Sequence, residues 1–132
     1  MTNEDEDLYW LTITVLQEAG GEPPEGKLGV AWVVMNRANR GKIRVPDVVL
    51  KPWAFSCWNT TSPTRKLITT RKDRTWELCE AASRAAYFGT ECDPTFGSTH
   101  YLNPAVLPKL PPWYSRKLVR AVLGAHHFLQ VD

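Results

Sequence analysis

Apolar side chains recur at helical spacing in three stretches of the chain, and glycine stands at or just after the end of each stretch. These stretches are residues 8–19, 23–41 and 75–88. Gly20 and Gly21 can supply the left-handed conformation that ends the first helix, and Gly89 stands at the matching position of the third. Pro23 and Pro24 suit the first turn of the second helix. The pattern predicts three helices, with the first two packed as neighbours because their connection is tight.

The C-terminal third has a different pattern. Residues 98–102 are typical of a short strand, and residues 104–112 form a proline-rich connection. Residues 117–123 and 126–131 predict two strands joined by a tight turn, with a C-terminal helix as the alternative. The whole pattern predicts an α+β fold, a mainly helical domain with a small antiparallel β-sheet near the C-terminus that closes one side of a cleft.

Residues 42–74 have no sustained period and are interrupted by proline, so we expect a long loop with at most one helical turn at residues 47–50. The loop is basic. Its charged residues are Lys42, Arg44, Lys51, Arg65, Lys66, Arg71, Lys72 and Arg74 against Asp47 and Asp73. Such a segment could attract a polyanion, and the alternative is a solvated loop without a partner.

Composition limits the classes of protein that remain. A chain of 132 residues with 43% hydrophobic and 11% aromatic residues has the size of one domain and argues against disorder. We therefore expect a single catalytic or binding domain over residues 1–132, with residues 1–7 as an acidic lead. No apolar run approaches the roughly 20 residues that cross a bilayer, and the acidic start differs from a secretory signal. Cys57, Cys79 and Cys92 form no CxxC pair, so we expect reduced thiols.

Glu18 is the first candidate for chemistry. On a helical projection it lies beside Leu8, Leu11 and Val15, at the margin of the buried stripe of the first helix. Apolar neighbours disfavour the charged form of a carboxyl group, so such a glutamate can hold and donate a proton near neutral pH. The alternative is a boundary residue that bends out to solvent or caps the next helix.

Aromatic residues gather around polar ones in three loop segments: Trp53, Phe55 and Trp58; His100 and Tyr101; Trp113 and Tyr114. Flat aromatic faces beside hydroxyl and amide groups suit a sugar-binding cleft, although such residues also form cores. The histidines have no metal-binding spacing, so we expect no metal and no cofactor. Nucleotide-binding and serine-hydrolase motifs are absent from the sequence.

Four short motifs follow one another along the chain. They are Glu18, Ala19, Gly20, Gly21 and Glu22 with Asn36 and Arg37 in the next helix; Phe55, Ser56 and Trp58; Thr99, His100, Tyr101, Asn103 and Pro104; and Gly124, His126 and Phe128. This order resembles the cell-wall hydrolase family of the spore-cortex-lytic type (SleB and CwlJ). The resemblance implies a lysozyme-like topology and cleavage of peptidoglycan glycan strands, with Glu18 as the catalytic residue. The substrate-binding residues it implies are Glu22, Phe55, Ser56, Trp58, His100, Tyr101, Asn103 and His126.

The chain also departs from the family. Gly20 occupies the position of an arginine in the family motif, so Arg37 or another basic residue has to supply that cation. We expect neither a separate binding domain nor an export signal, as in a phage endolysin. We therefore expect a monomer made in the host cytoplasm that reaches the periplasmic or cell-wall peptidoglycan through a separate membrane pore. There the basic segment over residues 42–74 could attract anionic polymers of the cell envelope.

Most glycosidases use two carboxyl groups, and a second one is hard to find in this sequence. A lytic transglycosylase needs one, because the C6 hydroxyl of N-acetylmuramic acid attacks its own C1 and forms a 1,6-anhydro product. We expect this reaction at the β-1,4 bond to N-acetylglucosamine. The alternatives are a hydrolytic muramidase and a peptidoglycan-binding module without catalysis. A nucleic-acid binder is disfavoured by the acidic N-terminus and the formal net charge of only +2.

Overall fold

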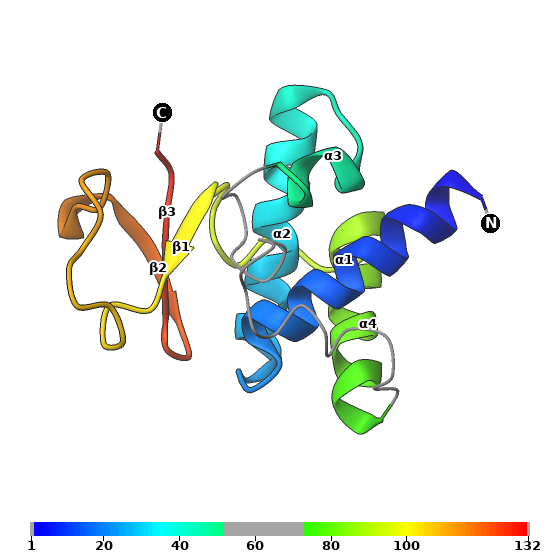
Figure 1. Ribbon diagram of the computed structural model, residues 1–132, viewed down its shortest axis with the longest axis horizontal. Coiled ribbons are helices and arrows are strands. Elements are labelled where there is room, and N and C mark those ends of the chain that lie inside the picture. The colour runs from blue at the N-terminus through cyan, green and yellow to red at the C-terminus, as the bar shows by residue number, and fades with distance from the viewer. Residues whose placement is uncertain (1, 52–72, 132) are drawn as a thin grey trace.

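Two helices joined by a short turn form the centre of the molecule (Figure 1). The structure is a computed structural model that describes residues 2–51 and 73–131. Helix α1 spans Asn3–Ala19 and helix α2 spans Pro24–Gly41, which confirms the first two predicted helices. Helix α1 begins earlier than its apolar pattern, because Thr2 and Asp5 form a capping box in which each side chain accepts from the other's backbone amide. Most of the predicted acidic lead is therefore helical.

One of the three helix ends differs from its prediction. Gly20 follows α1 with a right-handed φ of −58°, so the predicted left-handed end of this helix is wrong. Helix α2 ends at Gly41, as predicted, and Lys42 closes it at φ 53°. Helix α4, Arg74–Phe88, ends at Gly89 with φ 67°, as its sequence predicts.

The predicted loop over residues 42–74 contains a helix of its own. Helix α3 spans Val45–Val49, and Val45, Val48 and Val49 are all buried. The helix forms because these three valines pack into the core, a tertiary effect that a search for a sustained period does not detect. Arg44 is ion-paired with Glu6 and Asp7 at 2.8 and 2.9 Å, so part of the basic charge of this segment is neutralised within the chain.

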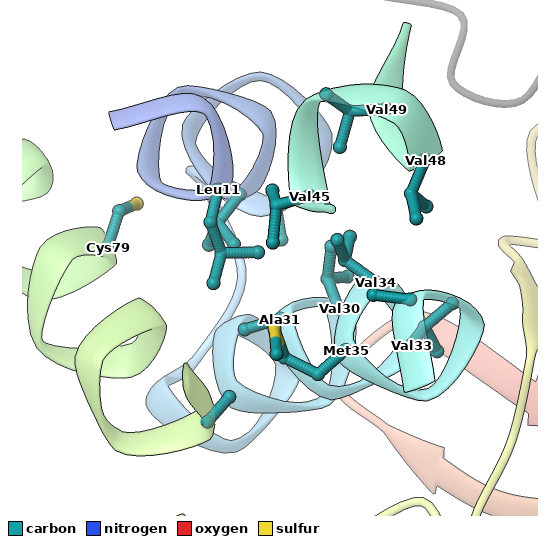
Figure 2. Packing of buried hydrophobic residues seen from close by; sticks show 14 of the residues in the cluster. Leu11, Val30, Ala31, Val33, Val34, Met35, Val45, Val48, Val49 and Cys79 are labelled. Atoms are coloured by element: carbon teal, nitrogen blue, oxygen red, sulfur yellow. The ribbon is translucent and has the colours of Figure 1, made fainter. Parts of the chain in front are cut away.

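The core lies between helices α1, α2, α3 and α4 (Figure 2). Leu11 and Val15 of α1 pack with valines of α2 and α3, and Cys79 and Ala86 contribute from α4. Small residues on α4 allow it to lie close to both long helices. Cys79 is buried and Cys92 is exposed, both as free thiols, whereas Cys57 lies outside the described residues. Within the described part of the chain, the helices lack the length and apolar character needed to span a membrane.

A three-stranded antiparallel sheet lies beside α2 (Figure 1). Its strands are β1, His100–Leu102; β2, Val119–Leu123; and β3, His126–Leu129, in the order β1-β3-β2. The predicted hairpin and the α+β fold class are therefore confirmed, and the alternative C-terminal helix is wrong. Strand β2 starts later than predicted because residues Arg116–Leu118 form a 3₁₀ turn.

Phe128 of β3 joins the sheet to the helical body. Its side chain is fully buried, and its ring lies against Gly29 of α2. A Cβ atom at position 29 would lie 2.7 Å from Phe128 Cζ, so only glycine allows this approach. The contact fixes the position of the sheet next to α2, and with it the position of β1 relative to the end of α1.

Candidate active site

Glu18 lies in the last turn of α1, half-buried at the side of a cleft. The cleft has a volume of about 820 Å³. The described residues that line it are Glu18, Arg37, Arg40, Gly41, Ile43, Val48, Lys51, Thr99, His100, Tyr101, Leu107, Trp113 and Val131. The Tyr101 hydroxyl donates a hydrogen bond of 2.5 Å to Glu18 Oε1. The carboxyl group is thus held in one orientation inside a cleft of the size that takes small ligands.

Two consecutive residues of α2 bring Tyr101 to Glu18. Asn36 Nδ2 donates to the Ser98 carbonyl at 2.9 Å, and Arg37 Nε donates to the Thr99 carbonyl at 2.6 Å. These bonds fasten the segment that leads into β1 to the side of α2. The Tyr101 ring is also supported from the neighbouring strand, since its centroid lies 5.8 Å from that of Phe128.

The structure does not support the two alternative roles for Glu18, which are capping helix α2 and bending out to solvent. Helix α2 begins after Pro23, and among the described residues no side chain caps its N-terminus. Glu18 also does not bend out to a convex surface, because it lines the cleft and accepts from Tyr101. The position derived from helical spacing, at the margin of the buried stripe, is therefore confirmed.

Arg37 lies in the same cleft as Glu18. Burial lowers the pKa of Arg37, and the charges of Tyr101 and Glu18 oppose this shift. The guanidinium group remains charged because an arginine pKa is far above neutral pH. Arg37 therefore supplies a cation in the same cleft as Glu18. That it takes over the role of the arginine replaced by Gly20 stays a prediction.

His100 and Trp113 form one wall of the cleft, with ring centroids 4.9 Å apart. His100 Nδ1 lies 3.0 Å from the Thr99 hydroxyl. Burial lowers the pKa of His100, and the positive charges of Arg37 and Arg40 lower it further. His100 is thus a neutral ring at neutral pH, able to hydrogen-bond a sugar hydroxyl and to extend the flat face of Trp113.

Glu22 and His126 contact each other outside the lining of the cleft. Glu22 Oε1 accepts from the Ala125 amide at 2.8 Å and lies 3.4 Å from His126 Nδ1. Burial lowers the pKa of His126, opposed by the charges of Glu22 and Glu18. These contacts fasten the β2–β3 turn to the α1–α2 turn. Substrate binding by Glu22 and His126 stays a prediction, and the structure gives both residues a role in holding the sheet.

Asn103 also lies outside the lining residues. Its side-chain oxygen accepts from the Ala105 amide at 3.1 Å and so shapes the turn after β1. Phe55, Ser56 and Trp58 fall outside the described residues, and their predicted contacts with substrate stay predictions. Among the predicted site residues, the structure thus brings together Glu18, His100 and Tyr101.

Comparison with known protein families matches residues 21–129 to the model of the cell wall hydrolases. The chain belongs to the cell wall hydrolase family. Solved structures agree with this assignment. The catalytic domain of the germination-specific lytic transglycosylase SleB from Bacillus anthracis is 25% identical with a TM-score of 0.75, covering 98% of this chain and 96% of that chain. The catalytic domain of the Bacillus cereus SleB protein is 25% identical with a TM-score of 0.71, covering 98% of each chain. Comparison with curated protein sequences gives no match.

The resemblance deduced from the four motifs and the lysozyme-like fold expected from it are therefore confirmed, as is the class of peptidoglycan-cleaving enzyme. A phage origin of the protein stays a prediction. In this cell wall hydrolase, the described residues contain no group of three His, Cys, Asp or Glu side chains arranged for a metal ion.

Sequence reasoning missed several residues that line the cleft of this cell wall hydrolase. Lys51 was included only in the general charge of the basic loop, and Arg40, Ile43, Val48 and Leu107 were not singled out. Arg40 has one usable signal, because it stands three residues after Arg37 and so lies on the same face of α2. The others come from segments without a regular pattern, so only the fold brings them to the cleft.

Proposed function

We propose that this cell wall hydrolase is a lytic transglycosylase that cleaves the β-1,4 bond between N-acetylmuramic acid and N-acetylglucosamine. Glu18 is its acid and then its base. The proposal depends above all on one observation: among the described residues that line the cleft, Glu18 is the only carboxylate. The activity printed for SleB of Bacillus anthracis, a lytic transglycosylase, supports the same reaction for its relative.

The positions of the other acidic residues support a mechanism with one carboxyl group. Residues 52–72 contain no Asp or Glu, so every acidic side chain except Asp132 belongs to the described part of the chain. Glu22 accepts from the Ala125 amide in the β2–β3 turn, and Asp93 accepts from Asn36, Thr95 and Gly97. A hydrolase with two carboxyl groups needs them about 5 to 9.5 Å apart across the scissile bond. The described lining offers no such pair.

The reaction then proceeds in two proton transfers. Glu18 gives its proton to the glycosidic oxygen, the bond between this oxygen and C1 of the muramic acid breaks, and positive charge develops at C1. The C6 hydroxyl oxygen of the same sugar forms the new bond to C1, and its proton goes to the Glu18 carboxylate. The carboxyl group is regenerated and no water is consumed.

Tyr101 and Arg37 support the charge that appears on Glu18 between these transfers. The Tyr101 hydroxyl donates to Glu18 Oε1, and a hydrogen bond to an ionised acceptor is stronger than one to a neutral acceptor. Arg37 places a positive charge in the same cleft. Both interactions strengthen as the proton leaves, which is the property that accelerates a chemical step. The faces of Trp113 and His100 suit the apolar side of a sugar ring.

Digestion of purified sacculi, followed by mass spectrometry of the soluble products, tests the proposal. Wild type is expected to release 1,6-anhydro-muropeptides, and Glu18→Gln is expected to release none. Reducing ends without anhydro products would instead establish the hydrolytic muramidase. Binding to sacculi without cleavage by wild type would establish a peptidoglycan-binding module.

The role in host lysis is a separate proposal. A phage endolysin without its own route across the membrane lyses cells only when a pore-forming protein is made with it. Expression of the chain in the cytoplasm, with and without such a pore, is expected to give a fall in culture turbidity only with the pore. Lysis without the pore would refute this route to the wall.

A further inference from the structure

The cleft holds more positive charge than a neutral sugar requires. Arg37, Arg40 and Lys51 all line it, and Glu18 is the only carboxylate among the described lining residues. Arg37 is partly buried, and it donates to the Thr99 carbonyl and interacts with the charge of Glu18. Arg40 and Lys51 are exposed residues at the side of the same cleft. Two cations are therefore presented in addition to the one close to the proposed acid.

The positive potential extends into the cleft. Arg40 follows Arg37 by three residues, so both project from one face of α2. Both charges lower the pKa of His100, which lies on the wall formed with Trp113. A group bound beside His100 therefore experiences the field of both arginines, and an anion is favoured there over a neutral group.

The chemistry of the substrate limits what this anion can be. The sugar rings of a peptidoglycan strand carry hydroxyl and acetamido groups, which are neutral. Negative charge near the scissile bond comes from the lactyl arm at C3 of the muramic acid. In an intact strand this charge is on the carboxylates of the attached peptide, and in a strand without peptide it is on the lactyl carboxylate itself.

We propose that Arg40 and Lys51 form a carboxylate-binding subsite that recognises the acidic lactyl arm of the muramic acid, so that the enzyme prefers strands with free carboxylates. This inference rests on the proposed function, because it uses the same cleft. Arginine suits the role, since its planar guanidinium group binds a carboxylate with two parallel hydrogen bonds. Lysine adds a second point charge on a flexible stem.

Two measurements on matched substrates test the subsite. The substrates are sacculi freed of attached phosphate polymers, the same sacculi with carboxylates converted to neutral methylamides, and glycan strands from which an amidase has removed the peptides. The first measurement is kcat/KM for release of soluble products. The second is co-sedimentation of the Glu18→Gln variant, which reports binding without catalysis. Arg40→Gln is the test variant, and Arg84→Gln on α4, outside the lining residues, is the control that removes the same charge.

Wild type and Arg84→Gln are expected to lose about tenfold in kcat/KM when the carboxylates are neutralised, the scale of one charge-assisted hydrogen bond. Arg40→Gln is expected to lose about tenfold on native sacculi and little more on neutralised ones. If wild type cleaves amidase-treated strands better than neutralised sacculi, the subsite binds the lactyl carboxylate. If it does not, the subsite binds a carboxylate of the peptide. Either result supports the proposal.

Wild-type activity that does not respond to neutralisation overturns the subsite, as does an equal response to neutralisation in wild type and Arg40→Gln. Failure of the proposed function has a different signature. If wild type cleaves none of the substrates, the reaction is wrong. The subsite is then tested by binding alone. It is supported if Glu18→Gln co-sediments less with neutralised than with native sacculi and if this difference disappears in the Glu18→Gln/Arg40→Gln double variant, and it is overturned if either result fails.

Discussion

Replacing Tyr101 with Phe removes the hydroxyl that donates to Glu18 Oε1 and leaves the ring in place. The ring keeps its neighbours on β3, Phe128 at 5.8 Å and His126 at 5.1 Å between centroids, so the fold should be retained. A hydrogen bond to a charged group contributes about 1.5 to 3 kcal/mol. Since each 1.36 kcal/mol is a factor of ten in rate, we expect kcat to fall by about tenfold to a hundredfold with little change in KM.

Tyr114→Phe is the matched control, because Tyr114 bonds His127 at 3.1 Å and does not line the cleft. An unchanged kcat in Tyr101→Phe, or an equal fall in both tyrosine variants, would refute the role of the Tyr101 hydroxyl. Thermal unfolding of each variant separates lost catalysis from lost structure.

Three further predictions concern the joint between the sheet and the helices. Glu22→Ala removes the acceptor for the Ala125 amide of the hairpin turn. The free energy of unfolding, measured by urea titration, should fall by about 1 to 3 kcal/mol. A rise in KM at unchanged stability would instead place Glu22 at the substrate. Gly29→Ala places a Cβ 2.7 Å from the Phe128 ring and should lower the free energy of unfolding by about 1 to 3 kcal/mol. Gly21→Ala is the control, because the space around Gly21 is open, and it should change that free energy by less than about 0.5 kcal/mol. Equal effects of the two variants would contradict the packing argument. Burial lowers the pKa of His126, so the unfolded chain takes up a proton first as the pH falls below about 6.5, and stability should decrease there until the folded residue also titrates. Thermal unfolding between pH 5 and 8 measures this loss, and His126→Gln should reduce it.

The helices could be predicted from the sequence because their apolar residues follow one period. Helices α1, α2 and α4 and the C-terminal hairpin all form where the pattern indicates. In place of helix α3 the pattern predicts at most one helical turn, because the helix has only five residues and depends on three buried valines. The early start of α1 depends on side-chain bonds between Thr2 and Asp5, which an apolar pattern does not include. Local periodicity thus finds long elements, and capping or tertiary contacts decide the rest.

The candidate site was only partly visible in the sequence. Glu18 could be found because a carboxylate at the margin of an apolar stripe conflicts with the helix pattern, and conflicts of this kind mark functional positions. Glu22 follows the same motif, yet its Oε1 accepts from the β2–β3 turn. Spacing along the chain cannot distinguish the two, because the difference lies in which distant segment each carboxylate meets. Glu18 meets Tyr101 across 83 positions, and Glu22 meets Ala125 across 103.

The pair Asn36 and Arg37 connects these observations. One residue binds the Ser98 carbonyl and the other binds the Thr99 carbonyl, and the strand that follows carries His100 and Tyr101 into the cleft. Arg37 also brings its charge to Glu18, at the place where Gly20 supplies none. A single turn of α2 therefore aligns the proposed acid with its hydrogen-bond donor and provides the nearby cation. The opening motif lacks its arginine, and the helix that follows supplies a cation to the same cleft.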